Sequence, residues 1–278
     1  LLMLCQTERQ LEKELEILSM ANSMNVHAKE VSKSELKTME PSIEINAVGG
    51  VFFKNDHHST PSDFMNQLKA YLKSKGVRVL ANESVVDFKV KEGKIESIVT
   101  DKQTLYSDEF VMASGSWSAD LCKKIDLKLL LQAGKGYSMN TQVSTGISIP
   151  TILAEAKIAV TPMDGFTRFA GTMEIAGINQ NINRKRVEVI AKAATQYYPS
   201  IQLSVSEMEA ATCGLRPLSP DGMPYIGKPQ SCENMTIATG HAMLGWTLGP
   251  GTGKLVSELI LNKKSSLDIS PYHPNRRF

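Results

Sequence analysis

The sequence predicts a mixed α/β protein of the α+β type, in which a mainly antiparallel, strand-rich part carries covering helices. Two observations lead to this class. Apolar residues recur at helical spacing in residues 7–24 and 183–198. Short runs rich in Val, Ile and Thr, separated by turn residues, occur in residues 77–112 and 137–171 and are typical of antiparallel strands. With 278 residues, 42% of them hydrophobic, the chain can bury one or two cores.

The helices are predicted from their caps. Thr7 with Gln10 is predicted to form a capping box ahead of an apolar stripe, and Ser32 with Glu35 is predicted to cap the next helix. Thr60 precedes Pro61, and proline favours the first helical position. The last helix is expected to follow a glycine-dense turn. The predicted helices span residues 7–24, 32–40, 60–75, 183–198 and 251–261.

The strands are predicted from alternating or β-branched runs bounded by turns. The apolar opening Leu1 to Leu4 is typical of a strand, and a turn at Glu92-Gly93 joins two strands of a meander. The remaining predicted strands span residues 77–80, 85–90, 95–100, 109–112, 137–141, 158–161 and 167–171.

Composition excludes several classes of protein. Lys and Arg total 31 against 29 Asp and Glu, so the net charge of +2 provides no basic surface for nucleic acid. The four cysteines lack paired spacing, which argues against a zinc site and a disulfide framework and favours a cytoplasmic location. Asp56-His57-His58 has no third ligand at a suitable spacing, so no metal site is expected. No apolar stretch reaches the roughly 18 residues of a membrane span, and peripheral attachment to the inner membrane stays open.

The segment from Cys213 to Gly253 contains the main candidate binding residues. Arg216 stands before Pro217 at a strand end, and its guanidinium fork suits a carboxylate, although most arginines are simply surface residues. Further along, glycines precede a helix whose N–H groups suit an electron-rich ring edge. We therefore expect a carboxylate substrate beside a flat aromatic cofactor.

These motifs resemble those of a known family. Gly214-Leu215-Arg216-Pro217 and Gly240-His241-x-x-x-Gly245-Trp246-Thr247 look like the signature of FAD-dependent D-amino-acid dehydrogenases, in the D-amino-acid oxidase superfamily with glycine and sarcosine oxidases. Lys135-Gly136-Tyr137-Ser138 and Ala113-Ser114-Gly115 fall in the order that the family has. The resemblance covers essentially the whole chain.

The resemblance implies roles for individual residues. Arg216 would bind the substrate carboxylate, and Tyr137 would stand near the reacting atoms. The Thr247 and Leu248 backbone would meet the flavin edge on which negative charge builds. The residues expected to contact FAD are Val85, Ala113, Ser114, Gly115, Gly240, His241, Gly245, Trp246, Thr247 and Leu248.

The resemblance also implies two domains built from alternating segments. Residues 1–60 and 126–212 would form most of the substrate domain, and 61–125 and 213–278 part of a Rossmann-like FAD-binding domain. The Gly-x-Gly-x-x-Gly turn that holds the FAD pyrophosphate in the family has no match in this sequence. We therefore expect this chain to be the C-terminal two thirds of a longer protein and to lack the N-terminal βαβ unit. By itself the chain is expected to hold FAD poorly and to self-associate.

The function implied is oxidative deamination of a D-amino acid: hydride passes from Cα to flavin N5, and the imino acid hydrolyses to a 2-oxo acid and ammonia. The alternatives are another flavin amine oxidase, acting on glycine, sarcosine or hydroxyproline, and a non-catalytic remnant that holds no FAD. The electron acceptor, a quinone or oxygen, is left open, as are the side-chain preference and the oligomeric state.

Overall fold

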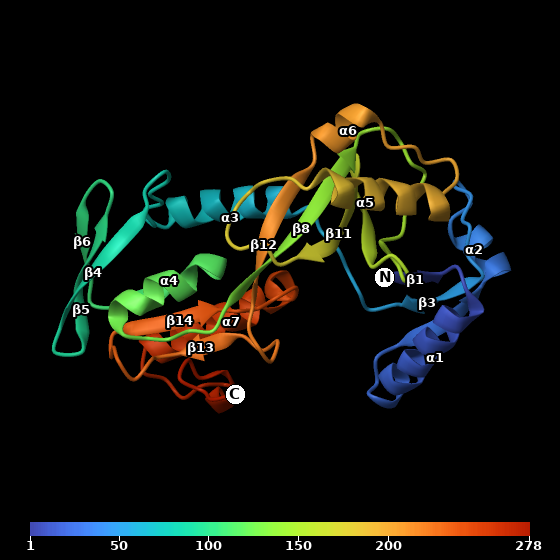
Figure 1. Ribbon diagram of the computed structural model, residues 1–278. Coiled ribbons are helices and arrows are strands. Elements are labelled where there is room, and N and C mark those ends of the chain that lie inside the picture. Colours follow the sequence, from blue (N-terminus) through green and yellow to red (C-terminus); the bar gives the residue numbers. More distant parts are fainter. The chain divides into compact units, whose positions relative to one another are not determined.

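The computed structural model describes residues 1–278, which form two compact units (Figure 1). Unit 1 comprises Leu1–Val77, Gly136–Met173 and Gln180–Gly214. Unit 2 comprises Arg78–Lys135, Glu174–Asn179 and Leu215–Phe278. The chain therefore passes repeatedly between the units, and each unit is described separately below.

Unit 1 holds the greater part of a large mixed sheet with the strand order β12-β8-β11-β10-β9-β1-β3-β2. Strand β1 is parallel to β9 and antiparallel to β3, with Leu2 opposite Thr151 and Phe52 respectively. The strands of this sheet are β1 (Leu2–Cys5), β2 (Ala28–Ser32), β3 (Gly49–Phe53), β8 (Gln132–Thr141), β9 (Thr151–Leu153), β10 (Ile158–Met163), β11 (Phe166–Glu174) and β12 (Thr212–Leu218).

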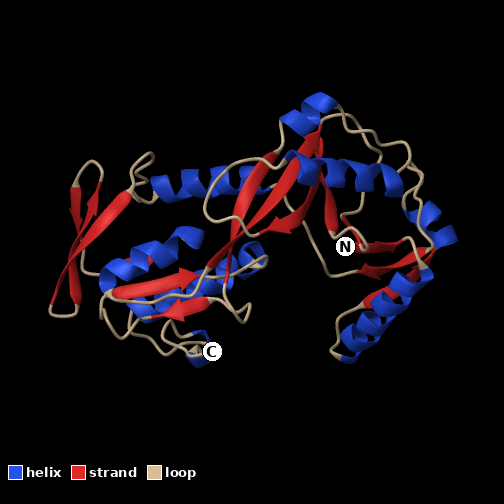
Figure 2. Cartoon of the chain, viewed as in Figure 1, coloured by secondary structure: helices blue, strands red, loops and turns tan.

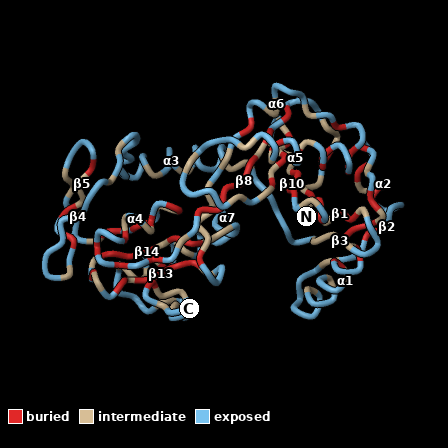
Figure 3. The backbone as a smooth tube through the Cα atoms, viewed as in Figure 1, coloured by how far each residue is buried: buried red, intermediate tan, exposed pale blue.

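The helices of unit 1 form where their caps were predicted, although only one of the two bonds of the Thr7–Gln10 capping box is present, since the Gln10 side chain bonds Glu14 instead. Thr7 accepts a hydrogen bond from the Gln10 N–H, and Ser32 with Glu35 forms a complete capping box. Helix α5 buries Val187 and Ile190 in the main core, which also contains the sheet residue Phe169. Figure 2 shows the helices and strands of the chain, and Figure 3 marks its buried positions in red. The helices are α1 (Glu8–Ser23), α2 (Lys33–Met39), α3 (Pro61–Ser74), α5 (Arg184–Tyr197) and α6 (Val205–Glu209).

Unit 2 is built on two small sheets. One has the order β13-β14-β7, with β14 parallel to β7, and the other is the antiparallel meander β4-β5-β6. Helix α7 packs on β13 and β14. The elements are β4 (Val85–Lys91), β5 (Lys94–Thr100), β6 (Thr104–Tyr106), β7 (Phe110–Met112), α4 (Ser118–Cys122), β13 (Tyr225–Gly227), β14 (Met235–Thr239) and α7 (Gly245–Ile260).

Two sequence predictions were wrong. Residues 77–80 form no strand, and Val77, Val79 and Leu80 are more than 40% exposed. A short β-branched run needs a partner strand, and the chain supplies none there. The last helix begins at Gly245 rather than near Gly251, because packing against β13 and β14 outweighs the low helix propensity of its glycines and Pro250.

No helix combines the length and the apolar character that crossing a membrane requires.

Candidate functional site

Strand β12 carries Arg216, the residue expected to bind a carboxylate. The Arg216 side chain is partly buried, and this burial lowers the pKa of its guanidinium. An arginine nevertheless stays protonated at physiological pH. A partly desolvated guanidinium interacts more strongly with a bidentate carboxylate than one surrounded by water. The setting of Arg216 therefore suits an anionic ligand.

The glycine turn after β14 lies beside the end of β12. An antiparallel bridge pairs Leu218 with His241. The Ala242 N–H donates a hydrogen bond of 3.0 Å to the carbonyl oxygen of Pro217. The strand that carries Arg216 and the glycine turn, both identified from the sequence, are thus direct neighbours within unit 2.

Gly240 makes the turn possible. Its φ is +82°, and a Cβ built on it would lie 3.0 Å from Tyr225 Cδ2. A residue with a side chain would be strained by its backbone and crowded by the Tyr225 ring. Ala242, two residues later, also has a left-handed φ of 48°. The chain is therefore reversed sharply between β14 and α7.

The first turn of α7 presents backbone N–H groups. Leu248 N–H already donates to the Leu244 carbonyl oxygen at 2.9 Å, whereas Thr247 N–H has no acceptor in the structure. Orphan N–H groups and the helix dipole make such a turn favourable for negative charge. Of the two backbone groups named from the sequence, Thr247 is therefore the available donor.

His241 ties the turn to the body of the helix. Its Nε2 lies 2.8 Å from the Thr252 hydroxyl oxygen, and burial lowers the pKa of the imidazole. The neutral ring is thus favoured, and one ring nitrogen is already engaged with a neighbour. These contacts fit a structural role in fixing the turn.

The loop after β7 joins the same region. Thr239 donates its hydroxyl to the Gly115 carbonyl oxygen at 3.1 Å, and Ser114 and Ser118 are joined by a 2.9 Å hydroxyl contact. The Ser116 hydroxyl is buried and has no hydrogen-bond partner. A buried polar atom of this kind commonly marks a place where a ligand or water binds.

The surface at the start of α7 is apolar and open. Met243 is 71% exposed and Trp246 is 50% exposed. Cβ atoms built on Gly249, Gly251 and Gly253 would meet nothing within 4 Å. A flat group could therefore approach the helix backbone closely.

Two predicted residues belong to structural elements other than this turn. Val85 begins β4 in the other sheet of unit 2, paired with Thr100. Tyr137 belongs to unit 1, where it is 1% exposed within the main core. Its burial is accounted for by packing, and its catalytic role stays a prediction.

Sequence reasoning missed several polar residues of unit 2. Ser116 directly follows the recognised motif Ala113-Ser114-Gly115, but the lack of a hydrogen-bond partner for its hydroxyl depends on tertiary burial. Thr252 lies 11 residues beyond His241, and their contact depends on how the intervening turn and helix fold. Lys135 is 1% exposed and hydrogen-bonds through Nζ to Asn179 Oδ1, and its place in a recognised motif was the available signal.

Comparison with known proteins identifies the family of the chain. A model of the FAD dependent oxidoreductase family matches residues 1–259. The chain belongs to this family. Members of the FAD dependent oxidoreductase family named D-amino acid dehydrogenase are among its relatives. The Helicobacter pylori protein is 28% identical over 93% of this chain and 62% of its own length. The Vibrio atlanticus protein is 34% identical over 79% of this chain and 53% of its own length. The chain thus spans less than two thirds of the length of these curated relatives.

Solved structures share the fold of this family member. Glycine oxidase from Geobacillus kaustophilus aligns with a TM-score of 0.89 and 21% identity, covering 100% of this chain and 74% of the other. L-proline dehydrogenase from P. horikoshii aligns with a TM-score of 0.84 and 20% identity, covering 99% and 75% respectively. These alignments confirm the mixed α/β fold class that the sequence predicted.

The residues of unit 2 fit part of an FAD molecule. The open glycine backbone and the free Thr247 N–H suit a flavin ring edge, and the orphan Ser116 hydroxyl lies in the loop beside Gly115. No Gly-x-Gly-x-x-Gly turn occurs in the 278 residues, so the usual pyrophosphate contacts are not among them. The fit therefore concerns the ring side of the cofactor.

Proposed function

We propose that this chain carries the ring-side cofactor contacts and the carboxylate-binding arginine of an FAD-dependent D-amino acid dehydrogenase. The observation that carries the proposal is the pairing of the Arg216 strand with the glycine turn, through Leu218–His241 and Pro217–Ala242. Relatives with this name, 28–34% identical, support the choice of substrate class.

In this proposal the two units divide the work. Unit 2, with Arg216 and α7, supplies the FAD-binding part, and most of unit 1 supplies the substrate domain. The segments that we assign to the substrate domain are 1–60 and 126–212, and those assigned to the FAD-binding domain are 61–125 and 213–278. Val85 and Ala113 to Gly115 would serve the adenosine side, and Gly240 to Leu248 the ring side.

Arg216 has the central task. Its fork would hold the amino acid carboxylate by two parallel N–H···O bonds, which fixes the orientation of Cα. FAD, when bound, supplies the two-electron acceptor for the hydride that leaves Cα. The Thr247 N–H and the α7 dipole favour negative charge at the helix start.

No protein acid or base is required in this scheme. The substrate amine can lose its proton to water before the Cα–H bond breaks, and water then hydrolyses the imino acid to a 2-oxo acid and ammonia. His241 is poorly suited to be a base, because one ring nitrogen contacts Thr252 and burial lowers the pKa of the imidazole. Catalysis would rest on positioning and electrostatics.

Substrate profiling tests the proposal. The complete gene product would be assayed with D- and L-enantiomers of several amino acids and with glycine, sarcosine, proline and hydroxyproline. Parallel assays would use oxygen, a soluble quinone and a quinone in vesicles as acceptors. D-enantiomers should be oxidised with release of ammonia. Preference for glycine, sarcosine or proline would favour another amine oxidase, and a protein without flavin absorbance would favour a non-catalytic remnant.

A further inference from the structure

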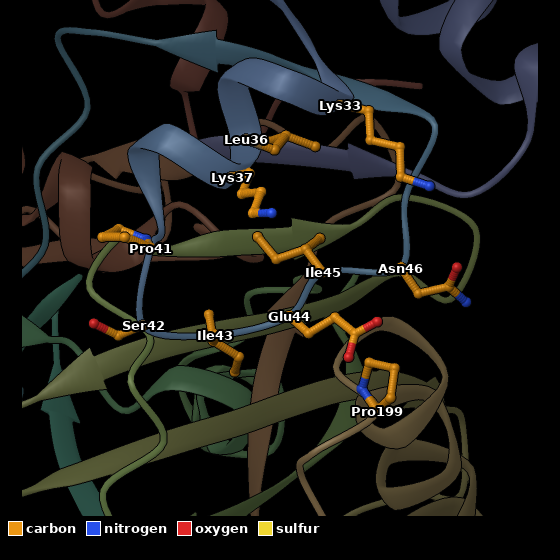
Figure 4. Close-up of a pocket in the computed structure, with 10 residues that line it drawn as sticks. All are labelled: Lys33, Leu36, Lys37, Pro41, Ser42, Ile43, Glu44, Ile45, Asn46 and Pro199. Carbon is orange, nitrogen blue, oxygen red and sulfur yellow. The ribbon is translucent and has the colours of Figure 1, made fainter.

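Unit 1 contains a cavity of about 690 Å³ between helix α2 and the loop that follows it (Figure 4). Its apolar surface comes from Leu36, Ile43 and Ile45, and Pro199 closes one side. The volume falls in the range of roughly 300–1,000 Å³ that is typical of small-molecule sites. None of the sequence motifs lies in this cavity, and the proposed reaction does not use it.

The walls of the cavity are held in place from several directions. The buried Glu40 carboxylate accepts hydrogen bonds from Ser148 N–H at 3.0 Å and Ile149 N–H at 2.6 Å. Asn46, at the other end of the loop, donates its side-chain N–H to the Gln196 carbonyl oxygen at 3.0 Å. The loop is therefore fixed at both ends, and the cavity exists before any ligand arrives.

Two lysines without ion pairs line the cavity. Lys33 and Lys37 stand one helical turn apart on α2, and neither forms a salt bridge or side-chain hydrogen bond in the structure. Figure 4 shows the Lys37 side chain extending from α2 toward the loop. Like charges at this spacing repel each other, so an anion bound between them would relieve a cost already present.

The nearby carboxylates do not neutralise these lysines. Glu35 is engaged by Lys29 at 3.1 Å and by the Ser32 N–H at 2.9 Å. Glu40 is occupied by the backbone of residues 148 and 149. Glu44 remains, and its carboxylate lies beside Pro199 across the cavity from α2 (Figure 4). The cavity therefore presents two positive charges and one negative charge above an apolar floor.

We propose that this cavity binds a small amphiphilic monocarboxylate, with its carboxylate between Lys33 and Lys37 and its hydrocarbon part on Leu36, Ile43 and Ile45. The net charge of the lining favours one negative charge on the ligand, since Glu44 would repel a second. The apolar floor favours an alkyl or aryl group over a purely polar anion. This site is independent of the proposed oxidation reaction.

Calorimetry with octanoate tests the site directly. The Lys33→Gln/Lys37→Gln double variant should weaken octanoate binding by about tenfold, because each exposed ionic contact contributes up to about 1 kcal/mol. Glu44→Gln should tighten it about twofold by removing a repulsion. The matched control is Lys185→Gln/Lys192→Gln, which removes two exposed lysines of α5 outside the cavity and should change nothing.

Three ligands complete the experiment. Octylammonium should bind at least tenfold more weakly than octanoate, and so should acetate and inorganic phosphate. The proposal is overturned if octanoate does not bind, if the lysine double variant binds it like the parent, or if phosphate or octylammonium matches it. Thermal unfolding of each variant verifies that the fold is intact.

Discussion

The Ala242 N–H donates a 3.0 Å hydrogen bond to the Pro217 carbonyl oxygen, one residue beyond Arg216. Proline has no N–H of its own, so at this point β12 offers only an acceptor. The glycine turn uses that acceptor and thereby fixes its distance from the arginine strand. Any displacement of the turn would also move the start of α7, since α7 follows after three residues.

Arg216→Lys tests the carboxylate role. Lysine keeps the charge but loses the planar fork, so kcat/KM for D-amino acids should fall about a hundredfold, or about 3 kcal/mol. Flavin content should not change, because the substitution leaves the glycine turn intact. Steady-state kinetics and the absorbance of bound flavin in the complete gene product measure both. Unchanged kcat/KM would remove Arg216 from the site.

Gly240→Ala tests the turn. The left-handed φ of +82° and the approach to Tyr225 should together cost at least about 1–2 kcal/mol of unfolding free energy. Gly249→Ala is the matched control: it sits in helix α7 with nothing within 4 Å of the new Cβ, and should stabilise the cofactor-free chain by up to about 1 kcal/mol. Urea unfolding compares the two. Equal effects of the two substitutions would contradict the assigned strain.

His241 gives the stability a pH dependence. Burial lowers its pKa in the folded state below the value of about 6.5 in the unfolded chain. The unfolded state therefore binds more protons as pH falls below this value, and folding stability should decrease. The slope from this residue cannot exceed about 1.4 kcal/mol per pH unit. Urea unfolding between pH 7.5 and 5.5 should show a smaller slope in His241→Gln, and an identical slope would contradict the prediction.

Glu40→Ala should destabilise the protein strongly. The change leaves the N–H groups of Ser148 and Ile149 without their carboxylate acceptor inside unit 1, at a cost of about 2–4 kcal/mol. Glu44→Ala, four residues on, removes an exposed carboxylate without hydrogen bonds and should stay within about 0.5 kcal/mol. Thermal unfolding distinguishes the two, and similar losses would show that the Glu40 contacts contribute little.

Helix caps and buried helix faces of this fold could be predicted from the spacing of residues close together in the sequence. The Ser32–Glu35 capping box and the buried face of α5 follow from spacing alone. The sheet order could not be predicted, because β1 pairs with β9, almost 150 residues away, through contacts that no local pattern encodes. The strand expected at 77–80 failed for the same reason, since strand formation depends on a partner.

The candidate site likewise has a part that could be predicted from the sequence and a part that could not. The motifs around Arg216 and Gly240 were visible in the sequence, but their contact through Leu218 and His241 is tertiary. The early start of α7 moved Gly245 to Leu248 from a turn into a helix, which satisfies the Leu248 N–H. Which backbone donor is available was therefore decided by packing.

Flavin binding by the 278 residues alone should be weak and should not be strengthened by a phosphate on the flavin side chain. Unit 2 offers an open helix start and a Thr247 N–H to a flavin ring, whereas the sequence has no Gly-x-Gly-x-x-Gly turn to neutralise a pyrophosphate. Riboflavin and FMN should therefore bind within about threefold of each other, a difference below about 1 kcal/mol.

Calorimetric titration of this chain with riboflavin, FMN and FAD measures that ratio. Gly249→Ala should weaken all three equally, because its new Cβ enters the space at the start of α7 that the ring would occupy. Lys185→Gln on α5 serves as the control and should weaken none of them. Micromolar or tighter binding of FMN with much weaker binding of riboflavin would mean that these residues hold a phosphate by contacts other than the glycine motif, and the view that this chain has no phosphate site would have to be abandoned.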